Sequence, residues 1–257
     1  MTEHVLVEKS EKLLVLTLNR PDKKNALTRA MYKTLATEIS YADDDPNIRC
    51  ILIMALGDMF TAGNDLADFA AIGNAAAAPK PEDGNPLLPA LAKSRTPIVA
   101  AVNGRAVGVG VTMLLHCDMV LLAEDAFLIT PFVNLAVVPE AASSLLMPLR
   151  IGHARAFEMF VLGEPVNAQK AVAWGIANRA VPPSELHRTA RATATAIAAR
   201  APAAVSATKS LMRDASVLLE QMGKENAIFI RQLKSPEFKE AFAAFSERRP
   251  PDFSKFG

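Results

Sequence analysis

The sequence predicts a layered α/β protein that continues into a helical C-terminal region. Aliphatic runs of strand length alternate with helical patterns as far as about residue 182, and from residue 183 the pattern is almost wholly helical. The chain has 257 residues, 51% of them hydrophobic, which is enough to bury a sizeable core. We therefore expect a core over residues 1–182 and a helical region over residues 183–257.

Four aliphatic runs predict buried strands of the core. They are LLVLTL at 13–18, CILIMA at 50–55, IVAAV at 98–102 and MVLLA at 119–123. Their length and their aliphatic side chains favour strands over helices. Helical signals lie between these runs, which is the order expected of an α/β layered fold.

Helical patterns occur between these strands and after them. Thr28 is expected to cap a helix that runs to about Tyr41. The side chains of Met31, Leu35 and Ile39 would share the buried face of this helix. Three later segments each suit a helix, at residues 185–201, 204–222 and 235–249.

Composition excludes several classes of function. The 28 Lys and Arg residues balance 27 Asp and Glu residues, so neither a nucleic-acid surface nor a basic membrane anchor is expected. No apolar run is long enough to span a membrane, and the start MTEHVLVEKS does not resemble a signal peptide, so we expect a cytoplasmic protein. The two cysteines are expected to be inert core thiols, and the four histidines show no metal-ligand spacing.

Residues 68–90 form a segment rich in Ala, Pro, Gly and Asn with little periodicity. Such a segment is either a surface loop or a mobile cover over a ligand site.

Two turns that contain glycine follow buried strands and carry the first chemical signal. They are GDMFTAGNDLADF at 57–69 and NGRAVGVGVTMLLHCD at 103–118. Glycine lets backbone N–H groups approach a ligand closely, and a helix that follows adds partial positive charge. One N–H group from each turn could together form an oxyanion hole. The second turn lacks the GxGxxG pattern of dinucleotide-binding proteins, because Met113 follows where a glycine is required.

Four segments together resemble the enoyl-CoA hydratase/isomerase (crotonase) superfamily. They are NRPDKKNAL at 19–27, FTAGNDL at 60–66, the stretch from IVAAVNG to ITPF at 98–132, and AVAWGIANRAVP at 171–182. The resemblance extends over nearly the whole chain. It implies a crotonase-like spiral of ββα units over 1–182, and a C-terminal region at 183–257 that helps to form a homotrimer or a dimer of trimers. It also implies an acyl-CoA thioester substrate and no separate cofactor.

The resemblance further implies which residues contact the thioester. By motif position, the two backbone N–H groups of the oxyanion hole fall on Ala62 and Val109. The same motifs place a set of substrate contacts at Ala26, Asn64, Asp65, Leu66, Gly108 and Phe132. For Asp65 the alternative is a structural role, as a helix cap or a partner of the loop backbone.

Family membership does not decide which reaction is catalysed, so the reaction is inferred from the side chains at the site. Hydratases of the family carry two glutamates, but Thr112 and Phe132 stand at those two positions here. Thr112 is expected to support the first helical turn. His116 lies on an apolar helical stretch without an acid or hydroxyl partner at useful spacing, and is expected to be a core histidine.

Another acid, Glu140 in VVPEAASS, is a candidate for the chemistry, because the stretch from Ala126 to Leu149 contains no other charge. The stretch resembles peroxisomal-type Δ3,Δ2-enoyl-CoA isomerases and their bacterial relatives, which use a single glutamate from this later turn. The resemblance therefore implies an isomerase with Glu140 as its base. The alternatives are an exposed Glu140 in a first helical turn that Pro139 starts, a 2-enoyl-CoA hydratase, and a non-catalytic acyl-CoA-binding protein.

Overall fold

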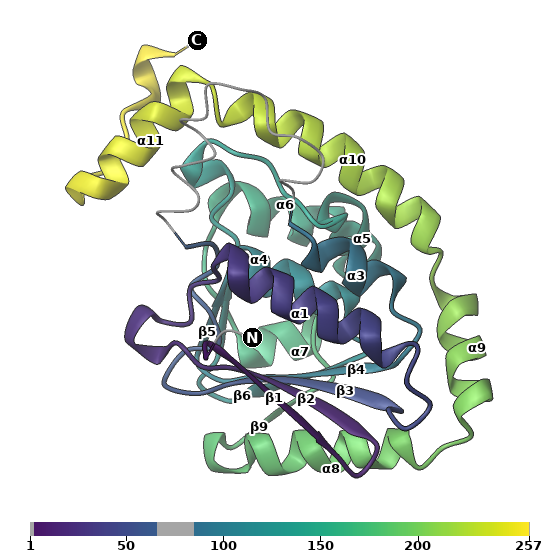
Figure 1. Cartoon of the computed structure of the whole chain (residues 1–257). Helices are drawn as coiled ribbons and strands as arrows, with labels where there is room; N and C mark the ends of the chain where they lie inside the picture. The colour runs from purple at the N-terminus through teal and green to yellow at the C-terminus, as the bar shows by residue number, and fades with distance from the viewer. Residues whose placement is uncertain (1–2, 66–84, 257) are drawn as a thin grey trace.

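The computed structural model describes residues 3–65 and 85–256, and it contains two β-sheets (Figure 1). The larger sheet has the strand order β1-β2-β3-β4-β6-β9. Its strands are β1 (Val5–Ser10), β2 (Leu13–Leu18), β3 (Cys50–Ala55), β4 (Ile98–Val102), β6 (Met119–Ala123) and β9 (Arg179–Val181). The smaller sheet has the order β5-β7-β8, with β5 (Arg105–Val107), β7 (Phe127–Ile129) and β8 (Val166–Asn167).

The larger sheet is parallel apart from its first strand. β1 and β2 form an antiparallel hairpin, whereas β2 pairs with β3 in parallel over its whole length, Leu13 opposite Cys50 and Leu18 opposite Ala55. Every residue of β2 is buried, as expected for a strand with helices on both faces of its sheet. The four strands predicted from aliphatic runs are confirmed with the bounds given above.

Helices cover both faces of the larger sheet (Figure 1). The helices of the described chain are α1 (Arg29–Ala42), α3 (Leu87–Lys93), α4 (Val109–Thr112), α5 (Ser143–Ile151), α6 (His153–Leu162), α7 (Ala168–Trp174), α8 (Leu186–Ala198), α9 (Pro202–Met212), α10 (Ala215–Gln232) and α11 (Pro236–Glu247). The last three, α9 to α11, lie away from this sheet (Figure 1). Short 3-10 turns are η1 (Pro21–Lys23), η3 (Met113–His116), η4 (Val133–Leu135), η5 (Pro183–Glu185) and η6 (Phe253–Lys255).

Helix α1 begins as the sequence predicts. The Thr28 hydroxyl accepts a hydrogen bond from the Met31 N–H at 3.3 Å, so one free donor of the first turn is satisfied. Met31, Leu35 and Ile39 are fully buried on one face. Thr28 therefore predicted the start of the helix, and the spacing of Met31, Leu35 and Ile39 predicted the face that packs on the core.

The C-terminal region contains one more helix than predicted, because the segment 204–222 divides into α9 and α10. Arg213 is extended (φ −150°, ψ 124°), and its guanidinium donates hydrogen bonds to the His116 and Leu91 carbonyl oxygens at 2.9 and 2.8 Å. Asp214 then caps α10 by accepting from the Ser216 N–H at 2.8 Å. At the break between the two helices, the partly buried Arg213 thus satisfies carbonyl groups of the core.

Helix α8 packs directly on the larger sheet, against β3, β4 and β6. Its buried side chains Leu186, Ala190, Ala194 and Ala198 belong to the same hydrophobic core as the strands. The division of the chain at residue 182 stays a prediction, and α8 shares its core with the residues before that point.

Two further expectations concern the whole of the described chain. Within residues 3–65 and 85–256, no helix combines the length and apolar character that a membrane span needs. Cys50 and Cys117 are buried free thiols, and burial raises the pKa of each to about 12, so both are unreactive as predicted.

Candidate active site

The two glycine turns of the sequence lie against each other. Thr61 bridges to the second turn, donating its N–H to the Arg105 carbonyl oxygen at 3.2 Å and accepting from the Val107 N–H at 3.0 Å. Gly63 has a φ of +88°, and a Cβ there would lie 2.9 Å from the Val107 carbonyl oxygen. The close approach of the turns therefore requires glycine at this position.

Backbone N–H groups along the first turn differ in whether they are already hydrogen-bonded, and this corrects one predicted oxyanion donor. The Ala62 N–H donates to the Lys24 carbonyl oxygen at 2.9 Å, so it is already engaged in a hydrogen bond. The Asp65 N–H is engaged too, donating to the Leu27 carbonyl oxygen at 3.0 Å. The Asn64 N–H makes no hydrogen bond with any residue that the structure describes. Asn64 rather than Ala62 has the available amide.

The second predicted donor, Val109, opens helix α4. Gly108 precedes it with φ 55° and ψ −116°, and the Gly108 N–H donates to the Ile129 carbonyl oxygen at 2.9 Å. As the first residue of the helix, Val109 has no carbonyl four residues earlier within it. In the described parts of the chain its N–H meets no other acceptor. A free amide at a helix N-terminus is suited to hold negative charge.

Glu140 lies over the last residue of the same helix. The Thr112 hydroxyl donates to Glu140 Oε1 at 2.5 Å. Thr112 follows Val109 by three residues, so the hydroxyl that binds the carboxylate belongs to a residue about one helical turn after Val109. Burial raises the pKa of Glu140 to about 7, against the opposing effect of the Thr112 hydrogen bond, and the charge of Glu225 raises the pKa further. Thr112 is therefore a partner of the candidate base, a role that the sequence did not indicate.

The turn that follows Glu140 is not helical. Ala141 and Ala142 have φ values of 65° and 55°, and α5 begins at Ser143. Glu140 is partly buried and precedes the helix, so the alternative of an exposed acid in a first helical turn is wrong. The Ser143 N–H donates to the Glu140 carbonyl oxygen at 3.1 Å and closes the turn.

Two buried polar residues hold this turn, and the sequence did not indicate that either of them contributes to the site. His116, in η3, contacts the Ala141 carbonyl oxygen through Nε2 at 2.7 Å. Glu225, in α10, accepts from the Ala142 and Ser144 N–H groups at 2.6 and 2.9 Å. Nothing in the sequence singles out Glu225, because an acid on an amphipathic helix usually faces solvent.

The remaining predicted substrate contacts fall into two groups. Ala26 and Asp65, the second of which belongs to the first turn, both contact Arg20. Its guanidinium donates to the Ala26 carbonyl oxygen at 3.0 Å and to the Asp65 carboxylate at 2.6 Å. This ion pair agrees with a structural role for Asp65. Phe132 is buried, with its ring edge-on to Phe160 at 5.9 Å between centroids. Leu66 and most of the segment 68–90 lie outside the described residues.

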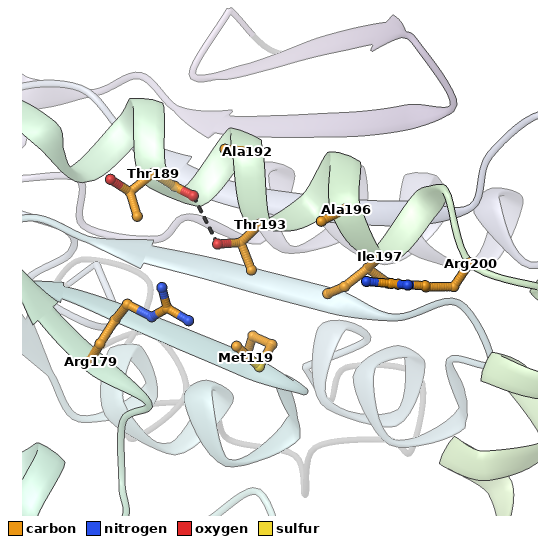
Figure 2. A pocket seen from close by; sticks show the side chains of 8 residues that line it. All are labelled: Met119, Arg179, Thr189, Ala192, Thr193, Ala196, Ile197 and Arg200. Atoms are coloured by element: carbon orange, nitrogen blue, oxygen red, sulfur yellow. Dashed lines mark hydrogen bonds between the residues drawn. The ribbon is translucent and has the colours of Figure 1, made fainter.

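A groove of about 440 Å³ opens elsewhere, between α8 and the strands β6 and β9 (Figure 2). Arg179 and Arg200 border an apolar floor that includes Met119 and Ile197. No predicted site residue lines this groove, and the larger sheet separates α8 from α4 (Figure 1). Within the described residues, no cluster of three or more His, Cys, Asp or Glu side chains could hold a metal ion.

Comparison with known proteins places this site in a family. The family model described as enoyl-CoA hydratase/isomerase matches residues 8–255. A probable enoyl-CoA hydratase of Mycobacterium tuberculosis is 33% identical over 254 residues, 98% of each chain. The 1,2-epoxyphenylacetyl-CoA isomerase of Escherichia coli is 31% identical over 263 residues, 99% of each chain.

A crystal structure of an enoyl-CoA hydratase/isomerase from Pseudoalteromonas atlantica superposes with a TM-score of 0.92 at 42% identity, covering 98% of this chain and 100% of that chain. The similarity extends through the core and the C-terminal helices alike. The chain therefore belongs to the enoyl-CoA hydratase/isomerase family of acyl-CoA enzymes and has the crotonase-like fold that its sequence predicts.

Proposed function

We propose that the protein is a Δ3,Δ2-enoyl-CoA isomerase with Glu140 as its single base. One observation carries the proposal: a partly buried carboxylate hydrogen-bonds to Thr112 of α4, whose first residue, Val109, has a backbone N–H without an acceptor among the described residues. A base and a donor for negative charge thus share one short helix. That pairing suits proton abstraction next to a carbonyl group.

The reaction needs one carboxylate and one oxyanion site. The C2 protons of a 3-enoyl-CoA are acidic because their removal gives a dienolate, with negative charge on the thioester oxygen. The N–H groups of Asn64 and Val109 stabilise that oxygen. Glu140 takes the proton from C2 and returns it to C4, so the double bond moves from C3–C4 to C2–C3 and the carboxylate is regenerated.

A 2-enoyl-CoA hydratase is the second candidate, since relatives with hydratase and dehydratase names match the chain along its length. Hydration must activate water and also protonate the α-carbon, work that two carboxylates usually divide. Among the described residues, Glu225 is a buried acid whose charge acts on Glu140, but its two oxygens accept from the Ala142 N–H, the Ser144 N–H and the Ser144 hydroxyl. It is poorly placed to be a second acid or base.

The test measures turnover of a 3-enoyl-CoA and a 2-enoyl-CoA of equal chain length side by side. An isomerase converts the first substrate and does not hydrate the second. Faster hydration of the 2-enoyl-CoA would replace the proposal with the hydratase. Tight acyl-CoA binding without turnover of either substrate would identify a non-catalytic binding protein.

We propose further that the acyl-CoA contacts six residues, namely Ala26, Asn64, Asp65, Leu66, Gly108 and Phe132. We also propose that the reaction uses no separate cofactor and that the enzyme works in the cytoplasm. For Asp65 the contact would add to its ion pair with Arg20. Protection of these residues from hydrogen exchange when a non-reactive acyl-CoA binds would support the contacts. Unchanged exchange at all of them would contradict them.

The proposed assembly is a homotrimer or a dimer of trimers. Large apolar side chains are exposed to solvent at the end of α9, where Leu211 is 89% and Met212 is 82% exposed. Phe157 and Leu162 of α6 are 58% exposed as well. Burial of such residues between subunits is typical of obligate interfaces. Sedimentation equilibrium at micromolar concentration checks this, and an active monomer would contradict it.

A further inference from the structure

The turn that carries Glu140 adopts a backbone conformation that alanine disfavours. Ala141 and Ala142 both lie in the left-handed region, with φ of 65° and 55°. The Cβ of an L-residue is crowded there, so two such residues in a row need support from outside. Within the turn, one backbone hydrogen bond joins the Ser143 N–H to the Glu140 carbonyl oxygen.

Support comes from two elements that lie far away in sequence. On one side, His116 Nε2 lies 2.7 Å from the Ala141 carbonyl oxygen. On the other side, Glu225 accepts from the N–H groups of Ala142 and Ser144. A carbonyl group and two amides of the same turn are therefore each held by a buried side chain.

The contact of His116 has a defined direction. A carbonyl oxygen only accepts, so Nε2 carries the hydrogen and donates it. Burial, with the charge of Arg213 adding to it, lowers the pKa of His116 to about 3, and the ring stays neutral. Nδ1 has no hydrogen-bond partner in the part of the chain that the structure describes. The bond to Ala141 is thus the polar contact that explains a histidine at this fully buried position.

The Glu225 side chain is buried too. It is 4% exposed, and the Ser144 hydroxyl adds a third donor to its carboxylate. Gln221, one helical turn earlier in α10, donates to the Ser144 hydroxyl oxygen at 2.9 Å. A buried charged side chain usually stabilises a fold no more than an apolar residue of the same size does. The hydrogen bonds that fix the Glu225 carboxylate therefore point to a role in positioning the turn.

We propose that His116 and Glu225 are positioning residues that hold the turn 140–144 from its two sides and thereby aim the Glu140 carboxylate at the acyl-CoA. The inference rests on the proposed function, in which Glu140 is the base. Neither residue touches the reacting atoms in this role. Misplacement of a base by about 1 Å is enough to slow a reaction by up to about 10²-fold.

A matched pair of variants tests His116. In His116→Gln the amide nitrogen can replace the Nε2–H donor, whereas His116→Met keeps similar bulk without a donor. We expect His116→Met to lower kcat about tenfold or more with KM and the Kd for a non-reactive acyl-CoA unchanged, and His116→Gln to restore most of kcat. Equal kcat in wild type and His116→Met would overturn the role of His116, as would an equal loss in both variants.

Glu225→Gln gives a second readout, which also stands alone if His116→Met does not fold. Among the described groups that contact Glu140 or its turn, Thr112 is uncharged, His116 is neutral, and Glu225 bears the charge that raises the pKa of Glu140. Removal of that charge should shift the acidic limb of the kcat–pH profile to lower pH by about half a pH unit. Loss of the support for the turn should lower the kcat of the plateau several-fold. An unchanged limb with an unchanged plateau would overturn the role of Glu225.

A Glu140→Gln control separates the two failures. If Glu140→Gln keeps wild-type turnover, the proposed function is wrong. If Glu140→Gln is inactive while His116→Met and Glu225→Gln behave as wild type, the positioning inference alone is wrong. Unfolding temperatures recorded for all variants ensure that kcat is compared between folded proteins.

Discussion

The turn with Glu140 and the helix segment with Glu225 each bury one carboxylate, but they hold it differently. Glu225 accepts hydrogen bonds from two backbone N–H groups and one hydroxyl, which occupy both of its oxygens. From the residues that the structure describes, Glu140 accepts one hydrogen bond through its carboxylate, from Thr112, and it belongs to a segment without other charges. Burial is the largest cause of the raised pKa in both groups.

The difference shows how two similar acids take different roles. A carboxylate whose oxygens are filled by donors caps a helix and fixes a turn, which is what Glu225 does for α5. A carboxylate with unused acceptor capacity and a pKa of about 7 can gain and lose a proton near neutral pH. Four predictions test whether this contrast is real.

The largest effect is expected from Glu140→Gln. The amide keeps the size of the side chain and removes its basicity, so kcat for the 3-enoyl-CoA should fall by at least ~10²-fold with acyl-CoA affinity retained. Glu158→Gln removes an exposed acid on α6 and serves as the control, with activity unchanged. Turnover of Glu140→Gln near that of the control would show that the base lies elsewhere.

The pH dependence of kcat should report the same group. Glu140 must be ionised to take a proton, and its pKa is raised to about 7. Below that pH, kcat should therefore fall about tenfold per pH unit, and above it kcat should level off. A profile measured from pH 5 to 9 checks this, and a flat profile down to pH 5 would mean that Glu140 is not buried as described.

The stability of Glu140→Gln should exceed that of the wild type at alkaline pH. Because the folded pKa is above the usual 4.5, the folded state holds the proton more tightly than the unfolded chain. The contribution of Glu140 to stability is therefore lost as pH rises through about 7. We expect the variant to gain roughly 2–3 kcal/mol between pH 5 and pH 8 relative to wild type. Urea unfolding at both pH values measures this, and a constant difference would contradict it.

The smallest effect is expected at Thr112. Thr112→Val removes the hydroxyl that lowers the pKa of Glu140, so the acidic limb should move to higher pH, opposite to Glu225→Gln. At pH 7, kcat should fall roughly threefold, with the alkaline plateau nearly unchanged. Thr112→Ser keeps the hydroxyl and should follow the wild-type profile. Coincident profiles of the Val and Ser variants would remove Thr112 from the account of Glu140.

The sequence by itself determined the parts of this protein that depend on local pattern. Aliphatic runs predicted the four central strands, and the spacing of Met31, Leu35 and Ile39 predicted the buried face of α1. The isolation of Glu140 in an apolar stretch was visible without a structure. These features follow from side-chain periodicity and composition, which the order of residues contains directly.

Only the tertiary structure decided how those parts meet. The Ala62 N–H is engaged and the Asn64 N–H is available because the pairing of the turn with Lys24 and Leu27 sets the direction of each amide. The break at Arg213 exists because its guanidinium bonds carbonyl groups more than ninety residues earlier. The pKa of Glu140 likewise depends on burial and on Glu225, from another helix. Hydrogen-bond direction and desolvation arise between segments distant in the chain, so no local pattern encodes them.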